Sequence, residues 1–284
     1  MKYLYTLLFA FVLSTAFAGD GQPYQIYNAK GKKVTYKEMI KQLGKSEVVL
    51  FGEYHNNSLG HWLQLKVTES LGQQHALILG AEMFESDNQQ GLTDYVKAKI
   101  NEEEFATEVR LWNNYKGDYR PLVEYAKANQ LPFIATNVPR RYASMLFKGG
   151  IEALDTLKVE EKAWIAPLPF PYDPELPGYK EMLTMFEAEH VNENLPKAQA
   201  IKDATMAHFI QRNFEEGKLF VHYNGSYHSN KYEGIVWYLK SYAPQLKVAT
   251  ITMVEAENVG NFEKLNQGLA DFILVIDANI LKSF

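Results

Sequence analysis

Polar residues that could bind a ligand or move protons directly follow four apolar runs of this sequence. They are Glu53 and His55 after the first run, then Glu82, Asn137 and His228 at or after the ends of the other three. Two of these stretches share the pattern G-x-x-H, namely Gly52-Glu53-Tyr54-His55 and Gly225-Ser226-Tyr227-His228. Carboxylates and imidazoles bind divalent metals and also act as acids and bases, so these positions are the first candidates for a functional site.

Two imidazoles and two carboxylates allow two kinds of chemistry. His55, His228, Glu53 and Glu82 match the ligand set of a hydrolytic zinc or manganese site. The same side chains can also work without a metal, with a histidine as base and a glutamate as its orienting group or as an acid. The competing interpretation is structural, with glutamates that cap helices and histidines that bond to buried carbonyls. We expect a functional cleft, because four separate strand ends carry polar residues.

Further candidates lie outside the two motifs. Arg140 or Arg141 could hold a carboxylate or a phosphate. Asp203 either reaches the cleft, where it would order an imidazole or an arginine, or faces solvent. Four other histidines are expected at the surface or the edge of the core; they are His61, His75, His208 and His222.

The elements that must position these side chains alternate between strand and helix. Short apolar runs predict buried strands over Val48–Phe51, Ala76–Met83, Leu131–Ala135, Lys218–Tyr223, Val248–Val254 and Phe272–Ile276. Helical spacing predicts helices over Tyr36–Leu43, Asn88–Ile100, Glu103–Trp112, Tyr119–Gln130, Tyr142–Leu154, Tyr179–His190, Leu195–Glu215 and Gly234–Ser241. The pattern predicts the α/β class, with a mainly parallel sheet, helices on both faces and all strand tips at one edge.

Three segments add detail to this prediction. A helix capped by Asn57 or Ser58 follows the first strand, and its inward face is expected to carry Leu59, Trp62, Leu63 and Val67. Gln22–Gly31 is interpreted as a polar and aromatic lead-in. Five prolines within Ala163–Gly178 exclude helix and central strand there, so an ordered excursion is expected, which begins a lid or insert over about residues 163–195.

Length and composition limit the remaining possibilities. The chain has 284 residues, of which 46% are hydrophobic, enough for a sizeable core. Its formal net charge of -5 argues against a nucleic-acid partner, and the absence of cysteine excludes disulfides and thiolate ligands. Lys2, the apolar run Leu4–Leu13 and Ala16-Phe17-Ala18 predict a signal peptide over residues 1–18, followed by one α/β domain over residues 19–284. We expect an exported protein, periplasmic or secreted, that does not span a membrane.

Five ordered motifs carry a resemblance to a known family. They are L-F-G-E-Y-H-N-N, A-E-M-F-E, P-F-I-A-T-N-V-P-R, A-Q-A-I-K-D-A-T-M-A and N-G-S-Y-H, from about Val48 to about Gly234. In this order they resemble the ChaN family of exported haem-binding proteins, within a superfamily that also contains Tiki-type metalloproteases and erythromycin esterases. Members are often lipoproteins, whereas this chain has no lipobox cysteine.

The resemblance implies an exported haem-binding protein with a role in haem or iron uptake; the alternative from the residues alone is a metal-dependent hydrolase. It implies haem as cofactor and partner, a homodimer upon haem binding, an iron-ligating tyrosine and a histidine of a second subunit at the propionates. Tyr172 and Tyr179, with Tyr115 as a further candidate, could supply the tyrosine. Arg140, Asn137 and Asp203 are the other candidate haem-binding residues.

Overall fold

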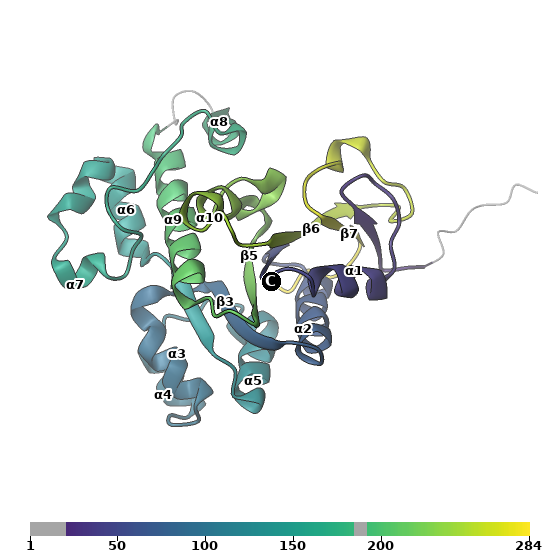
Figure 1. The fold of residues 1–284 in the computed structure, drawn as a ribbon, viewed down its shortest axis with the longest axis horizontal. Coiled ribbons are helices and arrows are strands. Elements are labelled where there is room, and N and C mark those ends of the chain that lie inside the picture. The colour runs from purple at the N-terminus through teal and green to yellow at the C-terminus, as the bar shows by residue number, and fades with distance from the viewer. Residues whose placement is uncertain (1–20, 185–191) are drawn as a thin grey trace, which may run out of the picture.

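A seven-stranded sheet runs through the centre of the structure, a computed structural model that describes residues 21–184 and 192–284 (Figure 1). Its strands are β1 (Tyr24–Asn28), β2 (Val48–Glu53), β3 (Ala76–Glu85), β4 (Phe133–Asn137), β5 (Lys218–Gly225), β6 (Val248–Ala256) and β7 (Phe272–Asp277). Their spatial order is β1-β7-β6-β2-β5-β3-β4. All neighbouring pairs are parallel except β1 with β7. The predicted α/β class with a mainly parallel sheet is therefore confirmed.

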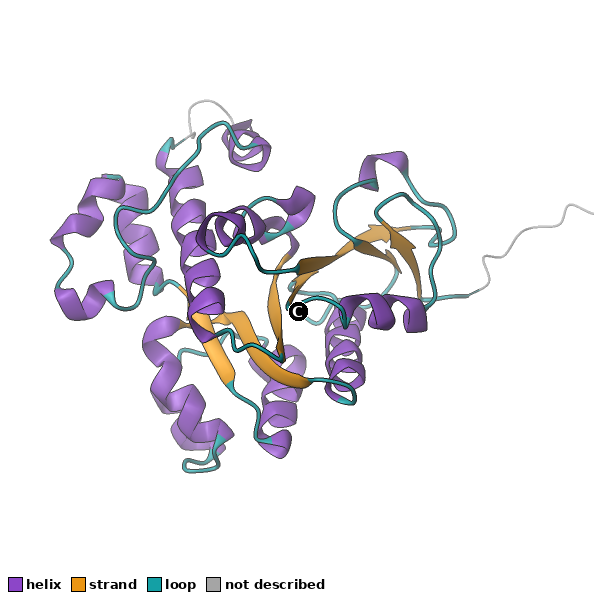
Figure 2. Ribbon diagram, viewed as in Figure 1, coloured by secondary structure: helices purple, strands orange, loops and turns teal. Residues whose placement is uncertain are grey.

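The helices cover both faces of this sheet, as the ribbon coloured by secondary structure illustrates (Figure 2). They are α1 (Tyr36–Leu43), α2 (Ser58–Gly72), α3 (Gln89–Val96), α4 (Glu102–Glu108), α5 (Arg120–Asn129), α6 (Arg140–Gly149), α7 (Val159–Lys162), α8 (Pro177–Thr184), α9 (Asn194–Asn213) and α10 (Ile235–Tyr242). Side chains of α1 to α5 belong to the same core as Val49 and Phe51, and those of α6 and α8 to α10 belong to the same core as Val48 and Leu50. The alternation along β2 thus buries one strand in two separate cores.

Two local predictions were wrong. The lead-in Gln22–Gly31 contains the edge strand β1, which pairs antiparallel with β7. In α2, Trp62 is 48% exposed, although Leu63 and Val67 are buried as expected. The inward face of α2 instead carries two polar side chains, His61 and Gln64, which the functional site explains.

The segment between α6 and α9 differs from the regular strand–helix alternation. Helix α6 ends at Gly149, earlier than predicted, because Gly150 follows with a positive φ of 79°. Residues 165–176 form neither helix nor strand, as predicted, but Pro177 and Gly178 begin α8, since a proline is tolerated in the first turn of a helix. Part of the predicted helix Tyr179–His190 lies outside the described residues. Within the described part of the chain, no helix is both long and apolar enough to cross a lipid bilayer.

Candidate functional site

The carboxyl ends of three adjacent strands bring the two G-x-x-H motifs together. Strand β5 lies between β2 and β3, and Glu53 at the end of β2 is paired in register with Gly225 at the end of β5. Glu82 lies near the end of β3, and the short helix after β5 carries His228. The parallel arrangement therefore places all four predicted acid–base residues at one edge of the sheet.

Glu53 is a buried carboxylate that accepts hydrogen bonds on both of its oxygens. Its Oε1 accepts hydrogen bonds from His55 Nδ1 at 2.8 Å and from the Tyr119 hydroxyl at 2.7 Å. Its Oε2 accepts a hydrogen bond from Gln64 and lies 3.4 Å from His61 Nδ1. Burial alone would raise the pKa of Glu53, but the hydrogen bonds and charges of the two histidines lower it to about 2. Glu53 is therefore ionised, and His55 must donate its Nδ1 proton to it.

His61 is a site residue that sequence reasoning missed. It is buried, not at the surface or the edge of the core, and its Nε2 lies 3.0 Å from the carbonyl oxygen of His55 and 3.5 Å from Asp118 Oδ2. Burial lowers the pKa of His61, but Glu53 and Asp118 outweigh that effect and raise it to about 9. A protonated His61 between two carboxylates thus supports the backbone that carries His55. The signal in the sequence was the spacing of His61 and Gln64 by three residues on one helix face.

The second motif builds a similar but more enclosed arrangement. His228 lies between two carboxylates, with Nε2 at 3.2 Å from Glu82 Oε1 and Nδ1 at 2.5 Å from Asp203 Oδ1. The Tyr179 hydroxyl donates to Asp203 Oδ2 at 2.9 Å, and the Gly225 amide donates to Glu82 Oε2 at 2.7 Å. Burial lowers the pKa of His228, but the charges of Glu82 and Asp203 raise it to about 10. Both nitrogens of this imidazole are therefore bonded to carboxylates of the protein.

The two arrangements meet at Gly225, where a larger residue would crowd the His55 imidazole. A Cβ at this position would lie 2.9 Å from His55 Nε2 and 3.5 Å from Glu82 Oε2. The predicted metal site is not supported at this meeting point. Within residues 21–184 and 192–284, no three histidine, aspartate or glutamate side chains are grouped so that they could hold a metal ion. The physical reason is that the carboxylates pair with the imidazoles instead of sharing an ion with them.

His222 is another buried histidine that was expected near the surface. It is fully buried under the site, with Nε2 at 2.8 Å from the Thr136 hydroxyl and Nδ1 at 3.1 Å from Asn224 Oδ1. Burial lowers the pKa of His222 to about 4. This imidazole is therefore neutral at pH 7 and forms part of a polar network below the strand ends.

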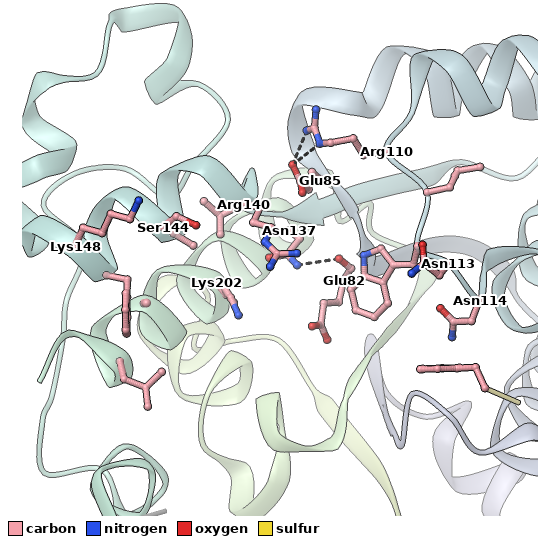
Figure 3. A pocket seen from close by; sticks show the side chains of 18 residues that line it. Glu82, Glu85, Arg110, Asn113, Asn114, Asn137, Arg140, Ser144, Lys148 and Lys202 are labelled. Carbon is pink, nitrogen blue, oxygen red and sulfur yellow. Dashed lines mark hydrogen bonds and ion pairs between the residues drawn. The ribbon is translucent and has the colours of Figure 1, made fainter. Parts of the chain in front are cut away.

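A large cavity adjoins the second motif at the same edge of the sheet (Figure 3). Its volume is about 870 Å³, and its apolar lining comes from Leu111, Trp112, Val138, Ala143, Phe147 and Leu195. Glu82 and Asn137 lie at its inner end, and Arg140, Lys148 and Lys202 are its cations without a described ion-pair partner. A smaller cavity of about 450 Å³ lies over Glu53, His55, Gly225 and His228, and Phe284 lines both.

The candidate haem-binding residues divide into two groups. Arg140 and Asn137 line the large cavity. Asp203 is buried behind it, bonded to His228, and Tyr179 is buried against Asp203 with Tyr172 stacked on its ring at 5.7 Å. The cavity lining includes neither of these tyrosines, nor Tyr115, which lies in the core of the other face of the sheet. Arg141 pairs with Asp87 and packs over the rings of Tyr142 and Trp164.

The chain is thus an α/β protein in which two G-x-x-H motifs meet at one edge of the sheet, beside a large cavity. Residues 39–239 match the family model described as "Haem-binding uptake, Tiki superfamily, ChaN". The chain therefore belongs to this family, as its motifs predicted. No curated protein sequence matches the chain significantly.

Two solved structures, those with TM-scores above 0.5, support the same fold. One, described as cofacial haem binding to ChaN of Campylobacter jejuni, is 18% identical with a TM-score of 0.65, over 91% of this chain and 98% of that chain. A Bacillus cereus protein is 10% identical with a TM-score of 0.53, over 85% of this chain and 90% of its own. An erythromycin esterase variant is 8% identical with a TM-score of 0.46, over 82% and 77%.

Proposed function

We propose that this chain binds haem in the large cavity at the carboxyl edge of the sheet. The observation that carries the proposal is a cavity of about 870 Å³, with apolar side chains along part of its lining, in a member of a haem-binding family. Haem is a flat and mostly apolar ring, so it needs apolar walls and enough room between them. Leu111 and Trp112 supply such side chains from the segment after α4, and Ala143 and Phe147 supply them from α6. When bound, haem would supply an iron centre.

Among the described residues, His55 fits best as the iron ligand. With no cysteine in the chain, tyrosine, histidine and methionine remain as ligand types, and the described lining of the large cavity includes none of them. His55 is the imidazole beside it: its ring contacts that of Trp112, with centroids 5.0 Å apart, and Trp112 lines the cavity. Because Nδ1 donates to ionised Glu53, Nε2 keeps the lone pair that a metal needs. A carboxylate on the far nitrogen commonly orients metal-binding histidines in this way.

The test is a titration of haemin into the purified protein, followed in the Soret region. We expect saturable binding by the wild type and a changed iron spectrum in His55→Ala, with partial recovery when imidazole is added. Tyr172→Phe is the matched control, because Tyr172 is not one of the residues that line the cavity. The absence of saturable binding by the wild type contradicts the function, whereas a changed spectrum in Tyr172→Phe with none in His55→Ala contradicts the ligand.

We further propose that the chain is exported and takes part in haem or iron uptake. The N-terminal pattern of Lys2, Leu4–Leu13 and Ala16-Phe17-Ala18 supports export, and the family supports uptake. N-terminal sequencing of the protein from its native host should begin at Gly19. A first residue of Met1 would contradict the cleavage.

Two copies of the chain could enclose haem between them. The related Campylobacter jejuni protein is described as binding haem cofacially, which supports this proposal of a homodimer. Exposed Arg140 and Lys148 lie at the cavity lining, so the cavity opens at the surface of one copy. Light scattering after gel filtration should give the mass of one copy without haemin and of two with it. A mass that haemin leaves unchanged would contradict the dimer.

A second candidate function is hydrolysis in the smaller cavity. His55 Nε2 favours it, since an imidazole oriented by an ionised carboxylate is suited to act as a general base. Activity on a small activated ester that is lost in His55→Ala would support it. If a chelator abolishes that activity, a metal is required; if it does not, the side chains suffice. No activity above that of His55→Ala would remove this candidate.

A further inference from the structure

After β7 the chain returns to the loop that follows β2 and carries the first motif. Residues Leu281–Phe284 lie antiparallel to this loop, with a β-bridge between Lys282 and Asn57. The Ser283 amide also donates a hydrogen bond to the Asn56 carbonyl oxygen at 2.9 Å. Figure 1 marks this end of the chain near the centre of the view. We name Leu281–Phe284 the strap.

A side-chain hydrogen bond connects the strap to the polar network behind His55. The Ser283 hydroxyl donates to Asp118 Oδ2 at 2.7 Å, and the same oxygen accepts a hydrogen bond from Asn114 Nδ2 at 2.8 Å. Asn114 also donates to the His55 carbonyl oxygen at 3.0 Å. Figure 3 shows Asn114 at the end of the large cavity that lies away from Lys148. The buried carboxylate of Asp118 therefore anchors both the strap and, through Asn114, the backbone of His55.

These contacts place the ring of Phe284 at the boundary of the two cavities. Among residues 21–184 and 192–284, Phe284 alone lines both the large cavity and the smaller cavity over His55. A ligand that occupies both cavities at once must therefore contact this ring. Phe284 is 70% exposed, so the ring can turn aside with little loss of buried apolar area. The ring is thus a wall that can move.

We propose that Phe284 determines the size of ligand that reaches His55 Nε2, with the strap as the segment that holds the ring in place. A small molecule reaches this nitrogen from the smaller cavity, whereas a bulky ligand requires the ring to move. The strap consists of exposed residues held by a few hydrogen bonds, so it can open while the sheet stays intact. The inference rests on the proposed function only because both candidate functions use His55 Nε2.

The experiment compares two ruthenium(II) complexes of different size, each of which attaches to histidine when an imidazole nitrogen displaces its water ligand. We expect the small aquopentaammine complex to label His55 at similar rates in the wild type and in Phe284→Ala. The bulkier aquo complex with bipyridine ligands should label His55 about tenfold faster in Phe284→Ala, as it would if the wild-type ring stood aside about a tenth of the time. Ser283→Ala should also speed the bulky complex, because it frees the strap from Asp118. Peptide mass mapping measures the label at each histidine.

Leu265→Ala is the matched control, because Leu265 is also an exposed apolar residue, at 76%, and lines neither cavity. Labelling of His75 in the same samples should be equal in all variants. If Phe284→Ala speeds both complexes equally, or neither, Phe284 does not select by size and the inference is overturned. If Ser283→Ala leaves the bulky complex unchanged, the role of the strap is overturned. No sample contains haemin, so failure here leaves haem binding standing, whereas a haemin titration without saturation overturns haem binding alone.

Discussion

His61 offers the sharpest test of the charge arrangement at the strand ends. The replacement His61→Gln keeps a polar side chain of similar length but cannot carry a positive charge. In the wild type, His61 lies 3.4 Å from Glu53 and 3.5 Å from Asp118, and the protein raises its pKa from 6.5 to about 9. A difference of about 2.5 pKa units corresponds to about 3 kcal/mol of unfolding free energy.

The sign of this contribution determines the pH range of the experiment. Because the folded-state pKa of His61 is raised, the folded protein holds the proton more tightly than the unfolded chain does. The stabilisation is therefore fully present below pH 6.5 and is lost as the pH rises through about 9. The wild type should exceed His61→Gln in stability at pH 6, and this advantage should shrink by about 3 kcal/mol by pH 9.5.

Urea unfolding of both proteins from pH 6 to pH 9.5 measures this difference directly. Taking the difference between the two proteins cancels the titration of other groups, His228 included. His75→Gln is the control, since His75 is half-buried and forms no ion pair among the described residues. A stability difference between the wild type and His61→Gln that stays constant over this pH range would refute the claim that His61 is held protonated.

Two further substitutions test the same site, each beside a matched control. Tyr119→Phe removes the 2.7 Å hydrogen bond to the ionised Glu53 carboxylate, so it should lower the unfolding free energy by about 2 kcal/mol. Tyr36→Phe loses a hydrogen bond to a neutral serine hydroxyl, so it should lower the unfolding free energy by about 1 kcal/mol or less. Urea unfolding at pH 7 measures both values. Gly225→Ala places a methyl group 2.9 Å from an imidazole nitrogen and should cost about 1–3 kcal/mol, while Gly117→Ala, with nothing within 4 Å, should stay within about 0.5 kcal/mol. Equal costs within either pair would contradict the corresponding contact.

The fold could be predicted from sequence because its strands are buried on both faces. Val48–Phe51 and Phe272–Ile276 are uninterrupted apolar runs, a pattern that a central parallel strand produces and a surface strand does not. The edge strand β1 was missed because it has five residues, of which only Ile26 and Tyr27 are buried, so it lacks the long apolar run of a central strand. Trp62 was misplaced because periodicity assigns apolar residues to the inward face, while α2 turns His61 inward instead.

The candidate site could be predicted only in part, for a related reason. Site residues at strand tips can be recognised in the sequence because a parallel sheet brings these tips to one edge, independent of the loop conformations. The groups that surround Glu53 come from other elements: Gln64 lies on α2, and Tyr119 closes the short π-helix before α5. The spacing of three residues between His61 and Gln64 is the local signal for Gln64. Nothing in the local sequence marks Tyr119, because its role depends on how the helices pack against β2. The same holds for Tyr179, whose hydroxyl is used by Asp203.

The two candidate functions compete for one atom. Both nitrogens of His228 are bonded to carboxylates, and His55 Nδ1 is bonded to Glu53, so among the four imidazole nitrogens of the two motifs only His55 Nε2 has no described hydrogen bond. That nitrogen can bind iron or accept a proton from a nucleophile, but not both at once. If the chain has esterase activity that depends on His55, haemin should inhibit it at the same concentration at which the Soret titration saturates. Activity that persists in the haemin-saturated protein would show that the two functions do not share this nitrogen, and that His55 is not the iron ligand.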